Sequence, residues 1–186
     1  MDTSHNPAPE VLASEDVFQG RIFTVSVDKV REGDQTHQRE VVRHPGSSAV
    51  VAVFADRTVA LVKQYRHPAV KYLLEIPAGS REPFEPPEEC AARELEEELG
   101  VVAGRLEKLS EFFVSPGFCA EKMWVYLATD LTETEQRPED DEILEIVRLS
   151  FPRAFEMIAA GEIEDAKTII GLTAAAARLG IPAGLL

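Results

Sequence analysis

Residues 79–101 constrain this chain more than any other stretch, because they combine a helix with a dense set of carboxylates. The stretch reads GSREPFEPPEECAARELEEELGV. Pro86 and Pro87 suit the first turn of a helix, where a missing N–H costs nothing. Apolar residues then recur at helical spacing as far as Gly100, which suits a left-handed cap. We therefore predict a helix over residues 86–99.

Three glutamates of that helix, Glu94, Glu97 and Glu98, occupy positions i, i+3 and i+4 and so share one face. Carboxylates this close repel one another unless a cation lies among them. Dense oxygen ligands favour Mg2+ or Mn2+, whereas zinc would favour histidine or cysteine. Arg93 lies four residues before Glu97 and can orient a carboxylate through a bidentate ion pair. From the residues alone, this face is either a divalent-metal site or a solvated acidic surface.

The fixed positions of the stretch follow the pattern G-x5-E-x7-R-E-U-x-E-E-x-G-U, with U aliphatic, and every position is filled. In this the chain resembles the Nudix hydrolases, which cleave a nucleoside diphosphate linked to another moiety. The resemblance implies an α+β fold, an α/β/α sandwich around a mixed β-sheet with an N-terminal β-hairpin. It also implies a metal-dependent site. Its metal ligands would be Glu94, Glu97, Glu98 and the Ala78 carbonyl, its catalytic candidates would include Glu97 and Arg93, and Glu85 would support the loop.

A turn further along the chain narrows the resemblance. Pro116 lies fifteen residues after Val101, in the segment SPGF. A proline near that offset is typical of the ADP-ribose pyrophosphatases within the Nudix hydrolases. The turn can bring backbone amides, including that of Gly117, and the Glu121 side chain toward a ligand. Without the resemblance, SPG could equally be an ordinary turn.

Two further matches concern substrate binding. Arg39 and Glu40 match an arginine–glutamate pair that these enzymes carry near the adenine base. Arg66 matches an arginine that contacts the phosphates or the adjacent ribose, a role suited to a permanently charged donor fork. From the residues alone, the first pair could be surface pairing on a hairpin strand, and the arginine could be an exposed strand end.

The acidic loop over residues 138–142 reads PEDDE. The resemblance implies that a glutamate outside the helix activates the attacking water. Alignment on Ile143 favours Glu139 as the base and Asp141 as a possible metal contact, whereas another family spacing favours Glu142. A solvated turn is the remaining interpretation of this loop.

The implied reaction is hydrolysis of ADP-ribose to AMP and ribose 5-phosphate. One alternative is a Nudix enzyme for another nucleoside diphosphate derivative, such as a nucleotide sugar or a dinucleotide. A second alternative is a non-catalytic ADP-ribose sensor, which degraded glutamates would favour. The intact set favours the enzyme.

Composition limits partners and location. The net charge of −14 argues against nucleic acid as a partner, and a diphosphate would need metal ions to bridge it to so acidic a protein. The two cysteines, Cys90 and Cys119, lack CxxC spacing, which favours free thiols in a reducing compartment. We see no signal peptide and no membrane-spanning run. These features predict a cytoplasmic protein with a small-molecule substrate.

The length of 186 residues predicts one domain over residues 15–186, after a flexible tail over residues 1–14. Alternating patterns predict a hairpin over residues 17–43, built from strands 17–29 and 36–43. Family members of this kind are usually homodimers with exchanged N-terminal strands, so the resemblance implies such a dimer. Further strands are predicted over 48–54, 58–65, 72–76, 106–114, 123–128 and 143–149, and further helices over 151–160 and 164–179. Phe112, Phe113 and Trp124 are predicted to be core residues rather than platforms on which a base stacks.

Overall fold

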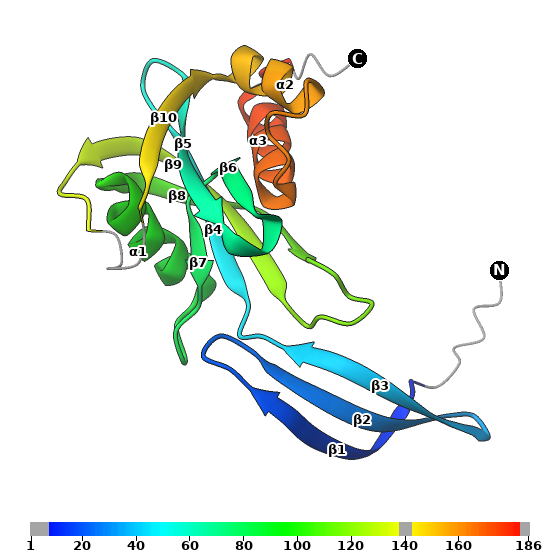
Figure 1. Ribbon diagram of the computed structural model, residues 1–186. Coiled ribbons are helices and arrows are strands. Elements are labelled where there is room, and N and C mark those ends of the chain that lie inside the picture. Colours follow the sequence, from blue (N-terminus) through cyan, green and yellow to red (C-terminus); the bar gives the residue numbers. More distant parts are fainter. Residues whose placement is uncertain (1–7, 138–142, 183–186) are drawn as a thin grey trace. The chain divides into compact units, whose positions relative to one another are not determined.

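The computed structural model of the chain describes residues 8–137 and 143–182 (Figure 1). Contacts between residues divide the chain into two compact units. The smaller unit comprises residues 1–46 and 113–122, and the larger unit comprises residues 47–112 and 123–186.

The smaller unit contains a three-stranded antiparallel sheet in the order β1-β2-β3, shown in blue in Figure 1. The strands are β1 (Glu10–Gln19), β2 (Thr24–Glu32) and β3 (Gln35–Arg43).

The predicted strand over residues 17–29 is wrong, because a turn divides it. In that turn the Gly20 N–H donates to the Phe23 carbonyl at 2.9 Å. The apolar residues Ile22 and Phe23 carry the alternating pattern across the turn, which hides it in the sequence. The predicted tail over residues 1–14 also ends too late, since β1 begins at Glu10.

The larger unit is built on a seven-stranded sheet in the order β10-β5-β4-β9-β8. The short strands β6 and β7 pair with β5 and β4, respectively. The sheet is mixed, because β4 runs parallel to β9 and antiparallel to β5. The strands are β4 (Ser47–Val53), β5 (Thr58–Arg66), β6 (Lys71–Glu75), β7 (Ala78–Ser80), β8 (Val101–Phe113), β9 (Lys122–Glu133) and β10 (Glu145–Ser150), and a 3-10 turn, η1 (His67–Ala69), joins β5 to β6.

Helices cover both faces of this sheet, with α1 (Pro87–Leu99) on one face and α2 (Phe151–Ala159) and α3 (Ala166–Leu179) on the other (Figure 1). The central strand β4 is buried along its whole length. Its alternate residues enter two separate cores: Val51 packs in the core that includes α2 and α3, while Val50 packs with α1. The predicted α/β/α sandwich around a mixed sheet is therefore confirmed.

The helix predicted over residues 86–99 is confirmed as α1. It ends at Gly100, whose φ of 62° lies in the left-handed region and whose N–H donates to the Glu96 carbonyl at 2.9 Å. The prediction that Phe113 is a core residue is wrong, because its side chain is 55% exposed. Phe112 and Trp124 do pack against the two cores.

Within the described ranges, no helix combines the length and the apolar character that a bilayer-spanning segment requires. Both cysteines are free thiols, and Cys90 is buried within α1.

Candidate active site

The loop that leads into α1 is anchored on the central strand of the sheet. Strand β7 pairs with the start of β4, so Gly79 lies opposite Ser48. The Val50 N–H donates to the Pro77 carbonyl at 2.9 Å, and the Ser48 hydroxyl donates to the carbonyl of Pro87 at 2.7 Å. Both ends of the loop are thereby held against a strand that is itself completely buried.

Gly79 lies directly against the carboxylate of Glu94. A Cβ atom added at Gly79 would lie 1.9 Å from Oε1 and 2.2 Å from Cδ of Glu94, so any side chain there would displace the Glu94 carboxylate. Glu98 is also buried, and its Oε1 lies 3.4 Å from the Ala78 backbone nitrogen, which donates to it. The loop backbone and two helix carboxylates thus share one confined space.

Arg93 links the carboxylates of this region. Its Nε and Nη2 donate to the two oxygens of Glu85 at 2.9 Å and 3.1 Å, which is a bidentate pair. Its Nη1 donates to Glu94 at 2.7 Å and to Glu97 at 2.9 Å. A single guanidinium therefore compensates three carboxylates, and its fork geometry fixes their orientation.

These contacts shift proton affinities in the expected directions. The hydrogen bond from Arg93 holds the pKa of Glu85 below its ordinary value, although burial acts against it. The hydrogen bond to Glu85 likewise raises the pKa of Arg93. Both side chains therefore stay charged at neutral pH, as a bidentate pair requires. Glu85 also accepts the Glu82 N–H at 2.9 Å, so it supports the loop itself.

Among the residues that the structure describes, no three histidine, cysteine, aspartate or glutamate side chains are arranged to hold a metal ion. The Arg93 guanidinium donates to both Glu94 and Glu97 and so acts as their counter-charge. The donor set nevertheless fits a hard divalent cation. It consists of carboxylate oxygens and backbone carbonyls, with no sulfur or imidazole, and the glycine at position 79 lets the backbone approach closely.

Arg66, at the end of β5, donates from Nε and Nη2 to the two oxygens of Glu75 at 2.9 Å and 2.7 Å. Glu75 is buried and also accepts from Lys167 of α3. Burial acts to raise the pKa of Glu75, but the hydrogen bonds and charges of Arg66 and Lys167 outweigh it and lower that pKa. Glu75 and Lys167 are not among the residues predicted from the sequence, because their contact depends on how β6 and α3 meet.

The smaller unit contains a cavity of about 450 Å3 that brings four predicted substrate-binding residues together. Its lining residues are Arg39, Glu40, Val41, Phe113, Pro116, Gly117, Phe118, Cys119 and Ala120. The segment after β8 joins β3 here, because the Val42 N–H donates to the Phe118 carbonyl at 2.8 Å and the Ala120 N–H donates to the Val42 carbonyl at 2.9 Å. The predicted Glu121 does not line the cavity.

Two aromatic rings line this cavity, Phe113, which was predicted to be a core residue, and Phe118, which was not among the predicted site residues. Both are more than half exposed, at 55% and 58%. Exposed phenylalanines that line a cavity beside charged side chains are typical of sites that bind flat rings. Their position on either side of the SPG turn was the available signal.

The predicted site residues fall into two groups. Arg39, Glu40, Pro116, Gly117 and Glu121 belong to the smaller unit, and Arg66, Ala78, Arg93, Glu94, Glu97 and Glu98 belong to the larger unit. The two candidates for the base, Glu139 and Glu142, lie outside the described residues.

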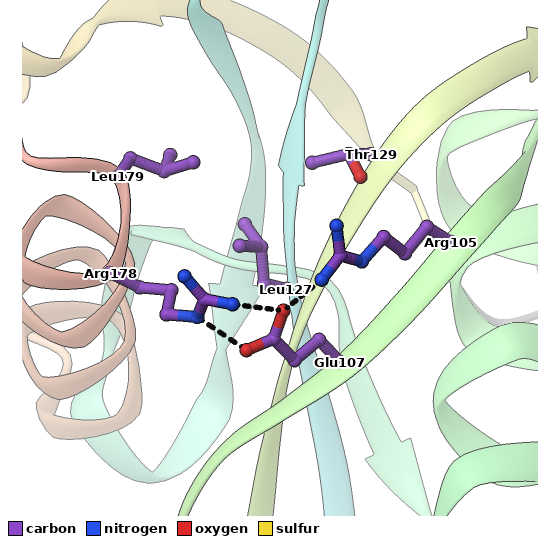
Figure 2. Close-up of a pocket in the computed structure, with 6 residues that line it drawn as sticks. All are labelled: Arg105, Glu107, Leu127, Thr129, Arg178 and Leu179. Carbon is purple, nitrogen blue, oxygen red and sulfur yellow. Dashed lines mark hydrogen bonds and ion pairs between the residues drawn. The ribbon is translucent and has the colours of Figure 1, made fainter.

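A second, small cavity of about 80 Å3 in the larger unit contains none of the predicted site residues (Figure 2). Arg178 of α3 and Arg105 of β8 both donate to Glu107, with Arg178 forming a bidentate pair. This arrangement ties the last turn of α3 to β8 and leaves Glu107 fully engaged, so we assign it a structural role.

Comparison with known proteins identifies the family of the chain. The chain is 38% identical to an ADP-ribose pyrophosphatase of Bacillus subtilis over 162 residues, which are 86% of this chain and 88% of that protein. It is also 38% identical to a methanol dehydrogenase activator of Bacillus methanolicus over 166 residues, 88% of this chain and 90% of that protein. A crystal structure of an ADP compounds hydrolase superposes with a TM-score of 0.81 at 26% identity, covering 96% of this chain and 97% of that chain.

The profile of the NUDIX domain matches residues 43–170, which include the loop, α1 and the acidic segment before β10. The family predicted from the glycine, arginine and glutamate spacing is confirmed, and the chain belongs to the NUDIX domain family.

Proposed function

We propose that this chain hydrolyses the diphosphate of ADP-ribose to give AMP and ribose 5-phosphate. The observation that carries the proposal is the cluster of Gly79, Glu94 and Glu98. In it, two buried carboxylates lie against the backbone of the loop that leads into α1. Buried carboxylates at this density are costly unless cations compensate them, which suits a site for a metal-bound diphosphate. The similarity to an ADP-ribose pyrophosphatase over most of both chains supports the choice of substrate.

In this proposal, Glu94, Glu97, Glu98 and the Ala78 carbonyl would hold Mg2+, with Mn2+ as a possible substitute. When bound, such an ion supplies charge compensation for the diphosphate and makes a water molecule more acidic. Arg93 keeps the Glu94 and Glu97 carboxylates oriented from one side, and Glu85 fixes Arg93 in turn. Either Glu139 or Glu142 would accept a proton from the attacking water.

The cavity of the smaller unit is our proposed site for the adenine base. Phe113 and Phe118 offer ring faces, and stacking of a base on an aromatic side chain contributes about 1–3 kcal/mol. Arg39 and Glu40 offer a donor and an acceptor for the polar edge of the base. Arg66 would contact the phosphates or the adjacent ribose.

We further propose a homodimer with exchanged N-terminal strands. All ten residues of β1 are exposed in the single chain, including four large apolar side chains. These are Val11, Leu12, Val17 and Phe18, which are between 41% and 58% exposed. An apolar strand of this kind is typical of an interface between chains. The cytoplasmic location also stays a prediction.

The proposed reaction is tested by incubating the protein with Mg2+ and a panel of nucleoside diphosphate derivatives, followed by chromatography of the products. The panel contains ADP-ribose, nucleotide sugars and dinucleotides. We expect AMP and ribose 5-phosphate from ADP-ribose at the highest kcat/KM. If another member of the panel has a higher kcat/KM, that compound is the preferred substrate and the choice of ADP-ribose is wrong.

A metal-free arm of the same assay tests the cofactor. Chelation should abolish turnover, and Mg2+ or Mn2+ should restore it, because the carboxylates otherwise repel the diphosphate. Full activity in metal-free buffer would contradict the proposed metal site.

A further inference from the structure

Arg66 is held by only part of its guanidinium. Nε and Nη2 both donate to Glu75, whereas Nη1 makes no hydrogen bond within the described part of the chain. The side chain is 37% exposed, so it is only partly enclosed by the protein. A guanidinium anchored along one edge retains donors on the other edge, which is the arrangement needed to bind an oxyanion.

The anchor itself is a buried carboxylate with two cations. The Glu75 side chain is 2% exposed, and burying it with one partner alone would carry a large desolvation cost. Lys167, which is 12% exposed, donates to the same oxygen of Glu75 that accepts from Arg66 Nη2. The ammonium therefore helps to keep Glu75 ionised and fixed, and only an ionised carboxylate accepts both bonds from Arg66.

Lys167 is held in turn by the first turn of α3. Its Nζ lies 3.1 Å from Oδ1 of Asp165, the residue that caps this helix. Asp165 accepts the Thr168 N–H at 2.9 Å, and the Thr168 hydroxyl accepts the Ile76 N–H at 2.9 Å. The hydrogen-bonded chain thus returns to the residue directly after Glu75, so both ends of the arrangement are fixed.

The charges of this cluster balance, with Arg66 and Lys167 opposite Glu75 and Asp165. Holding Arg66 in place therefore leaves no uncompensated charge in the interior. Besides the hydrogen bonds of Glu75, the charges of Glu98 and Asp165 raise the pKa of Arg66. Glu98 belongs to the carboxylate cluster of α1, so Arg66 lies within electrostatic range of the proposed metal site.

We propose that Glu75 and Lys167 are positioning residues that fix the Arg66 guanidinium so that its Nη1 edge meets the diphosphate of the substrate. The inference rests on the proposed function, because it assigns Arg66 a phosphate contact. It adds a residue of the C-terminal helix to the substrate-binding machinery. A purely structural tie between β6 and α3 is the competing interpretation, and it makes a different prediction for binding.

The test compares Lys167→Met, Lys167→Arg and Lys71→Met with the unmodified protein. Lys71→Met is the matched control, because Lys71 pairs with Glu164 and so also joins β6 to the segment before α3, but both side chains are 47% exposed. Each protein is measured in three ways: thermal unfolding, kinetics with ADP-ribose and Mg2+, and calorimetric binding of ADP.

For Lys167→Met we expect KM for ADP-ribose and Kd for ADP to rise about tenfold or more, while kcat stays within about threefold, since a loosened phosphate contact weakens binding of ground state and transition state alike. Lys167→Arg should recover both constants to within about threefold of the unmodified protein, because a guanidinium restores the second cation of Glu75. Lys71→Met should leave both constants unchanged.

If Lys167→Met lowers the melting temperature but leaves KM and Kd unchanged, the inference is wrong. Lys167 then only joins β6 to α3. Failure of Lys167→Arg to recover binding would overturn it as well. ADP binding does not depend on turnover. If the unmodified protein cleaves no ADP-ribose, the proposed function fails, and the ADP binding of the same variants still decides the role of Lys167.

Discussion

Gly79 and Glu94 approach so closely that a Cβ atom on the glycine would lie 1.9 Å from the carboxylate oxygen. The two residues come from β7 and α1, and both elements are fastened to β4. Because neither element can move without disturbing the central strand of the sheet, an added Cβ atom would be accommodated by a shift of the Glu94 carboxylate. Gly79 is required here for space, since its φ is not in the left-handed region.

Gly79→Ala should lower the free energy of unfolding by about 1–3 kcal/mol, the usual range for overpacking a confined site. It should also remove metal-dependent hydrolysis, because the Glu94 carboxylate must turn away from the added methyl group. Denaturant unfolding and the product assay measure the two effects. Gly117→Ala is the stability control, since no atom lies within 4 Å of a Cβ built there. Equal stability of both variants would contradict the confined contact.

Glu98→Gln should lower activity by about 100-fold or more, which corresponds to about 2.7 kcal/mol of transition-state stabilisation. The substitution keeps the shape of a buried side chain but removes a charge that the metal would need. Glu96→Gln is the matched control on the same helix, because Glu96 is 39% exposed and faces Arg137 at 3.7 Å. Small and equal losses at both positions would contradict a metal-binding role for Glu98.

Glu139→Gln and Glu142→Gln should differ in kcat while KM changes little, because only one of the two carboxylates can accept the proton of the attacking water. The Arg93-bound glutamates of α1 are poor bases once they bind metal. A general base typically contributes about 10^2- to 10^4-fold, so steady-state kinetics will separate the two variants. If the double variant keeps a near-normal kcat, neither residue is the base.

The two cysteines should react at very different rates with a thiol-specific disulfide reagent. Burial raises the pKa of Cys90 to about 11, so its reactive thiolate is scarce at pH 8. Cys119 is half-buried and should react first. We expect one fast thiol in the folded protein and a second only after unfolding in guanidinium. Two fast thiols at pH 8 would contradict the burial of Cys90.

The raised pKa of Cys90 also makes the free energy of unfolding depend on pH at high pH. The folded state binds the Cys90 proton more tightly than the unfolded state, whose thiol has the ordinary pKa of 9.0. The stabilisation is therefore complete below about pH 9 and declines as pH rises toward the folded pKa. Substitution of Cys90 by alanine should remove this part of the decline.

A double variant with Val11→Asp and Val17→Asp should convert the proposed dimer to a monomer. Both side chains are exposed on β1 in the single chain, so their replacement costs little within the smaller unit but places two charges in an apolar interface. Light scattering measures the mass, and Glu15→Gln on the same strand serves as the control. If the unmodified protein is monomeric and fully active, the proposed exchange of strands between two chains is wrong.

The sequence predicted the elements whose patterns are local. The helix over residues 86–99 was bounded by prolines and a glycine, and the β-branched runs of β4 and β5 are buried strands. The turn at Gly20 was missed because Ile22 and Phe23 continue the alternation of their neighbours. Strand β7 was missed because three residues carry no periodicity, and its existence depends on β4.

The sequence predicts the arrangement of the candidate site residues only where their spacing along one helix determines which side chains lie together. Glu94, Glu97 and Glu98 share a face because helical spacing requires it. The contacts of Arg66 with Glu75, and of Glu75 with Lys167, depend on how β5, β6 and α3 meet. The cavity beside Arg39 likewise forms where two distant segments pair, so the exposed Phe113 resembled a core residue in the sequence.

The bond between Lys167 and Glu75 spans 92 residues of sequence, and so does the bond between Ile76 and Thr168. A ribosome adds about 5–20 residues per second, so α3 leaves it several seconds after β6. A chain that lacks α3 can offer Glu75 only Arg66, one of its two cations. On our proposal, a chain that has not yet packed α3 against β6 binds nucleoside diphosphates poorly, and full affinity is acquired only when α3 is in place.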